Sequence, residues 1–153
     1  MRAMFLLLWT TLIPAAAETH VSLVAKVGGR VIPAEGNGEC STSSESTIYD
    51  VPATQWHAML AGGNGSELEN VNVTVWRPKA GGPDQVTLFM TVGKRTHRIA
   101  TVSGGEQAGR ATVSARPEGK GGTLLVEGTT AEGTPITLKL RCSTFSEIVD
   151  GNG

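Results

Sequence analysis

The sequence predicts a mainly β protein: an antiparallel β-sandwich or curled sheet of about seven to eight strands with one short helix. Two observations predict this class. Several segments of five to nine residues alternate apolar and polar side chains, which is the period of a strand with one buried face. Many of the 20 glycines lie between these segments, where glycine typically marks turns.

Residues 1–17 are predicted to be a cleaved signal peptide and to lie outside the fold. Arg2 supplies the positive start, residues 3–13 are mostly apolar, and Pro14 ends that stretch. Three alanines follow, and we expect cleavage after Ala17. The apolar stretch is too short to cross a bilayer, which takes about 20 residues, so we expect a secreted or periplasmic protein without a transmembrane anchor.

One β-rich domain is expected over residues 18–143, followed by a flexible tail over 144–153. Its first part is predicted to hold a strand at 19–27, a short return strand at 30–32 and a loop at 33–38. Residues 41–47 are expected to be irregular or an exposed edge strand. The first strand shows the alternation well, because Val21, Leu23 and Ala25 occupy every second position.

The one helix is predicted at about residues 53–61. Trp56, Met59 and Leu60 stand at positions i, i+3 and i+4, which is helical spacing, and Asp50 or Thr54 could cap the start. A glycine-rich run at 62–65 would end it. Such a short helix would need packing against a sheet for stability.

The remaining strands are expected at 68–77, 85–92, 96–102, 110–115, 123–127 and 136–142. The last is the most regular, because Ile136, Leu138, Leu140 and Cys142 alternate with polar residues. Cys40 and Cys142 are the only cysteines, and an even number in an exported chain predicts a disulfide. Neither cysteine belongs to a C-x-x-C motif or has metal ligands at the usual spacing.

No catalytic or metal-binding motif stands out. His20, His57 and His97 fall in three different segments, without H-x-H or H-E-x-x-H spacing, and there is no G-x-S-x-G motif. We therefore expect no metal, no cofactor and no enzymatic activity. Asn64 and Asn72 stand in N-x-S/T triplets, which would be glycosylation acceptors if the source is eukaryotic.

The densest charge is basic and lies at Lys94, Arg95 and Arg98, and Arg77 could join it if its strand is a neighbour. Two interpretations remain open: a site for an anionic partner such as a glycan, a phospholipid headgroup or an acidic protein, or a solvated edge that discourages strand-to-strand association. Nucleic acid is not expected as a partner, because the net charge is −1 and the few aromatic residues do not interleave with the basic ones.

Three short motifs resemble the mycobacterial 19-kDa lipoprotein antigen family: Cys40-Ser41-Thr42, the GTTA turn at 128–131, and ITLKLRCS at 136–143. The resemblance covers roughly residues 36–143. It implies a small secreted or surface β-domain with one disulfide and no enzymatic residues. The chain differs from the family in having no lipid-attachment cysteine at the expected cleavage site.

These observations together predict an exported, monomeric, non-enzymatic β-domain of the cell envelope. It would act as a binding, structural or antigen-like protein, with a partner that the sequence does not name. The alternative is a secreted enzyme inhibitor or small hydrolase that acts through an exposed loop, for which residues 78–84 and 104–109 are the candidates.

Overall fold

The computed structural model describes residues 17–63 and 65–149. The predicted signal peptide, apart from Ala17, lies outside them. The described residues form the strands β1 (Glu18–Val27), β2 (Arg30–Ile48), β3 (Val51–Ala61), β4 (Leu68–Pro78), β5 (Gln85–Val92), β6 (Arg95–Ala100), β7 (Arg110–Glu118), β8 (Gly121–Thr129), β9 (Pro135–Cys142) and β10 (Ser146–Glu147).

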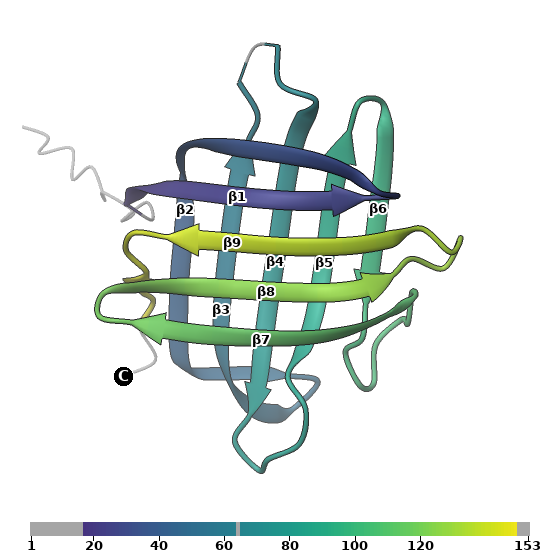
Figure 1. The fold of residues 1–153 in the computed structure, drawn as a ribbon. Coiled ribbons are helices and arrows are strands. Elements are labelled where there is room, and N and C mark those ends of the chain that lie inside the picture. The colour runs from purple at the N-terminus through teal and green to yellow at the C-terminus, as the bar shows by residue number, and fades with distance from the viewer. Residues whose placement is uncertain (1–16, 64, 150–153) are drawn as a thin grey trace, which may run out of the picture.

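The strands form one nearly closed, barrel-like sheet in the order β6-β5-β4-β3-β2-β1-β9-β8-β7, and all neighbours on this path are antiparallel. Figure 1 shows two layers that cross at a steep angle: β1, β9, β8 and β7 in front, and β3 to β6 behind. The two ends of the path approach each other where Ala100 and Ala108 exchange two backbone hydrogen bonds of 2.8 and 2.9 Å. This bridge nearly closes the sheet.

Strand β2 connects the two layers. Its residues 30–39 pair with β1, and its residues 39–48 pair with β3. Glu39 has a partner on both sides, Glu18 and Met59, so the strand passes from one layer to the other at this point. Gly38 precedes it in a crowded position, where an added Cβ would lie 2.3 Å from the carbonyl oxygen of Met59.

The core lies between the layers and is filled by every second residue of the main strands. The predicted alternation in β4 and β9 is confirmed, because the inward-facing apolar residues of both are buried. Examples are Val71, Val73 and Val75 on β4 and Ile136, Leu138 and Leu140 on β9. The mainly β, antiparallel class is confirmed as well.

The predicted helix at 53–61 is wrong, because these residues lie in β3. Trp56, Ala58 and Leu60 are buried, whereas His57 and Met59 between them are only partly buried. Positions i and i+4 fit both a helix and a strand. Here the strand period of two prevails, because β4 pairs with β3 from Ala53 to Ala61. No helix occurs within residues 17–63 and 65–149.

The predicted count of seven to eight strands is too low, and the fold is closer to a closed barrel than to a sandwich. The predicted loop at 33–38 is wrong, because these residues belong to β2, and residues 41–47, for which an edge strand was one of two expectations, belong to β2 as well. Within the segment expected as a tail, β10 pairs in parallel with β2, and the neighbouring Phe145 packs against the core. The described part of the chain has no helix suited to crossing a membrane.

Candidate functional site

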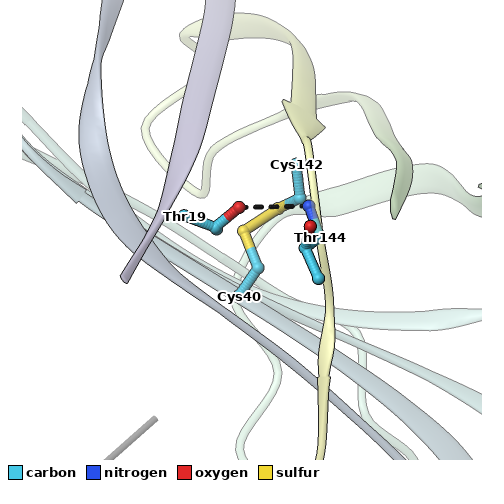
Figure 2. Close-up of a disulfide and its surroundings, with 4 residues drawn as sticks. All are labelled: Thr19, Cys40, Cys142 and Thr144. Carbon is cyan, nitrogen blue, oxygen red and sulfur yellow. Dashed lines mark hydrogen bonds between the residues drawn. A yellow bond between two sulfur atoms is a disulfide. The ribbon is translucent and has the colours of Figure 1, made fainter. Parts of the chain in front are cut away.

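The predicted disulfide is present and links the end of β9 to β2, next to the point where β2 changes layer. Cys40 and Cys142 are both buried, and their Cα atoms are 6.3 Å apart. Beside the bond, the amide of Thr144 donates a 3.1 Å hydrogen bond to the hydroxyl of Thr19, as Figure 2 shows. The disulfide therefore ties the end of β9 to β2, and the hydrogen bond ties the segment after β9 to the start of β1.

Arg77, one of the predicted anion-binding residues, is occupied by the fold. Its guanidinium donates two hydrogen bonds to Asp84, at 2.9 and 2.8 Å, and a third to the carbonyl oxygen of Ala115 on β7 at 3.0 Å. It also lies 5.0 Å from the centre of the Trp56 ring. The hydrogen bonds to Asp84 raise the pKa of Arg77 above its ordinary value. Arg77 thus fastens one end of the sheet across the gap between β4 and β7.

The predicted basic cluster does not form one surface. Arg95 is level with Val92 on β5 and Leu68 on β4, and Arg77 is nine residues further along β4, about 30 Å away at strand spacing. Arg98 lies on the outer face, with its guanidinium 3.4 Å from Glu106. The side chains separate because neighbouring residues of a strand point to opposite faces.

Arg95 instead lies with residues distant in the sequence, at the end of the sheet opposite Arg77. A cavity of about 370 Å³ opens there between the β1–β2 hairpin and the β5–β6 hairpin. Its polar lining comes from Arg30 on β2, Arg95 and His97 on β6, and Thr134 between β8 and β9. Apolar side chains of β1, β2 and β5 complete it.

The charges that line this cavity are basic. Among the ion pairs of the described residues none involves Arg95, whereas Arg30 pairs with Glu67, which is not part of the lining. His97 is only 8% exposed. Burial and the nearby Arg95 lower the pKa of His97 below its ordinary value, and Glu132, also outside the lining, opposes that shift. His97 is therefore mainly neutral at pH 7.

The other two histidines lie elsewhere. His57 is on the outer face of β3, where its Nδ1 is 2.8 Å from the hydroxyl of Thr74, and burial lowers its pKa against an opposing effect of Glu39. His20 on β1 is 3.6 Å from Glu35. Within the described ranges no three His, Cys, Asp or Glu residues come together as metal ligands would.

The loops proposed for an inhibitor are each fixed to the sheet at one or two residues. In residues 78–84, Asp84 is bound by Arg77, and the amide of Gly81 donates to the carbonyl of Pro78. In residues 104–109, Glu106 pairs with Arg98, and Ala108 is bridged to Ala100. The tip of the first loop is exposed, because residues 79–83 are exposed and no atom lies within 4 Å of a Cβ added to Gly81 or Gly82.

Sequence reasoning found Arg95 but missed Arg30 and Thr134. Arg30 follows the Gly28-Gly29 turn, a visible hairpin signal, yet only the pairing of β1 with both β2 and β9 brings Arg30 and Thr134 to the same end as β6. Comparisons with protein-family models, with curated proteins and with solved structures found no match for this chain.

Proposed function

We propose that the chain is an exported, non-enzymatic binding protein whose cavity around Arg95 holds an anionic group of its ligand, such as a sulfate, a phosphate or a carboxylate. The observation that carries the proposal is that Arg95 has no carboxylate partner among the described residues and shares its cavity with Arg30 and the buried His97. Arginine presents a planar fork of N–H donors that matches the oxygens of such groups.

The size and setting of the cavity support this role. A volume of about 370 Å³ falls in the lower part of the range for small-ligand sites, so it suits a small anionic group or the charged end of a larger molecule. Arg30 and Arg95 are both exposed, so an anion can reach either guanidinium from solvent and form charge-assisted hydrogen bonds there. The Cys40–Cys142 disulfide supports export, because such bonds persist in oxidising compartments.

The test is a calorimetric titration with sodium sulfate and, separately, sodium acetate at low ionic strength, where charge interactions are least screened. We expect saturable binding of at least one anion and a loss of about tenfold or more in affinity for Arg95→Ala. Lys94→Ala is the matched control, because Lys94 is the neighbouring exposed cation and does not line the cavity. Equal losses in the two variants, or no binding of either anion, would contradict the proposal.

The pH dependence of sulfate binding gives a second readout. A bound anion favours the protonated imidazolium of His97, so sulfate affinity should rise as the pH falls from about 7.5 to about 5.5, while sulfate itself stays fully charged. Two charged groups act on the pKa of His97: Arg95 lowers it and Glu132 raises it, while Arg30 lines the same cavity. In His97→Gln the rise should be lost. If the variant keeps it, His97 does not contact the anion.

A further inference from the structure

A second hollow, of about 470 Å³, lies on the outer face of β4, β5 and β6. The β2–β3 turn and the loop after β6 enclose it, and the lining that matters for its chemistry is Tyr49, Trp76, Thr87, Arg98, Gly105 and Glu106. None of these residues lines the cavity at Arg95. Two aromatic rings, one hydroxyl and one ion pair therefore converge on a single open hollow.

Tyr49 is held in a backbone conformation that its residue type disfavours. Tyr49 and Asp50 form the two-residue turn between β2 and β3 with φ angles of +46° and +65°. Asn-Gly is the usual choice for such turns, and a tyrosine in the left-handed region costs about 1–2 kcal/mol. The turn would be more stable without this side chain, so its presence points to a use outside the turn.

The Tyr49 ring is placed at the hollow by two glycines. A Cβ built on Gly105 would lie 2.8 Å from the Tyr49 hydroxyl, and one built on Gly104 would lie 3.5 Å from the Tyr49 Cβ. The ring therefore rests directly on the glycine backbone of the loop. The residue as a whole remains 61% exposed, so the ring is available to a ligand.

Trp76 forms a fixed part of the wall. Its indole N–H donates a 3.1 Å hydrogen bond to the side-chain oxygen of Gln55, and that oxygen also accepts a 2.9 Å hydrogen bond from Ser46. The indole is thus oriented before any ligand arrives. An aromatic wall of this kind can pack against the C–H face of a sugar ring at little cost in side-chain entropy.

The polar groups are matched in charge. Arg98 and Glu106 lie 3.4 Å apart, so the hollow holds one positive and one negative group side by side. Nε of Arg98 is buried without a hydrogen-bond partner, so the sheet does not satisfy this guanidinium completely. A guanidinium beside a carboxylate offers both donors and acceptors, which is what adjacent hydroxyl groups require.

We propose that this hollow is a subsite for a neutral pyranose sugar, the ring of which packs against Tyr49 and Trp76 while its hydroxyls bond to Arg98 and Glu106. The balance of charge disfavours an anionic ligand here, in contrast to the cavity at Arg95. The two sites share no lining residue, so the result of this test does not depend on whether the cavity at Arg95 binds an anion.

The test is a titration of the protein with maltotriose and cellotriose, followed by intrinsic tryptophan fluorescence and by calorimetry, up to about 10 mM because isolated sugar sites are weak. We expect saturable binding of one trisaccharide. Tyr49→Asn should weaken it by about tenfold or more and leave the melting temperature equal or higher, because asparagine suits the turn. Glu106→Ala should weaken it as well.

Lys94→Ala is the control, because Lys94 is exposed and lines neither this hollow nor the cavity at Arg95, and it should bind the trisaccharide as the unmodified protein does. Three results would overturn the inference: no saturable binding of either trisaccharide, unchanged affinity in Tyr49→Asn, or competition by sodium glucuronate stronger than by glucose. The last would mean that the hollow prefers an anion.

Discussion

Arg77 illustrates how a single side chain can hold one end of this fold together. Its bidentate partner Asp84 has only 9% of its side chain exposed, and the third hydrogen bond reaches β7 on the far side of the gap. Replacing Arg77 with alanine leaves a nearly buried carboxylate without its partner and removes the contact with Trp56. Because the guanidinium itself is 45% exposed, we expect a moderate loss in the free energy of unfolding, about 1–3 kcal/mol.

Urea denaturation of Arg77→Ala measures this loss. Arg116→Ala is the matched control, since Arg116 is an exposed arginine on β7, and its effect should stay within about 0.5 kcal/mol. Arg77→Lys should fall between the two, because lysine keeps the charge and loses the planar fork. If Arg77 and Arg116 give equal losses, the proposed role of Arg77 is wrong.

The basic residues show what sequence reasoning can and cannot reach at this scale. The sequence shows that Lys94, Arg95 and Arg98 are close along the chain, but strand alternation sends Arg95 to the cavity and Arg98 to the outer face. The turn at Gly93-Lys94 was visible in the sequence, and it indicated that Arg95 begins a new strand. The partner Arg30 lies 65 residues away in sequence, so only the tertiary fold reveals it.

Strand β2 is the element that gives the sheet its barrel-like form, and Gly38 is its tightest point. A Cβ there would come within 2.3 Å of the carbonyl oxygen of Met59 and 2.9 Å of a methyl group of Val21. We expect Gly38→Ala to destabilise the protein by about 2 kcal/mol or more, because β1 or β3 would have to move. Thermal unfolding followed by circular dichroism measures the change.

Gly63→Ala is the control for that prediction. Gly63 lies in the β3–β4 connection and has no atom within 4 Å of an added Cβ, so the substitution should change stability by no more than about 0.5 kcal/mol. Equal effects at the two glycines would show that backbone freedom, and not crowding at the layer change, sets the cost.

The strands differ in how well the sequence predicts them, because the alternation of apolar and polar residues is clear in some and hidden in others. Strands β5 and β9 alternate over their whole length and β4 alternates from Val71 to Trp76, so their period was clear. In β3 the apolar residues at 56, 59 and 60 matched helical spacing, and Ala58 is too small to signal the strand. In β2 the glycines, Pro33 and a run of serines and threonines resembled loop chemistry, although pairing with two different strands makes them a strand.

For the whole molecule, the disulfide is expected to be a major source of stability. It closes a loop of about 100 residues, which the chain-entropy model values at about 4–5 kcal/mol. Denaturation with and without a reducing agent should show a loss of about 3 kcal/mol or more on reduction. Cys40→Ala with Cys142→Ala should reproduce it.

Thiol alkylation of the denatured, unreduced protein followed by mass spectrometry provides the complementary check. The protein should carry no alkyl group on either cysteine. Modification of both Cys40 and Cys142 would mean that the bond does not form in solution, and the stability argument would then fail.

Strand β1 pairs with β9 from Val27 opposite Ile136 to Val21 opposite Cys142, so the first strand of the sheet takes its second neighbour from the far end of the chain. As the protein is synthesised, β1 and β2 can form a hairpin early, but one edge of β1 must wait until β9 is available. Every other pairing in the order from β6 to β7 joins strands that are consecutive in the chain, so closing the long loop between β1 and β9 is the step expected to slow folding. The edge of β1 is thus the surface that most needs protection from other chains while the protein is incomplete.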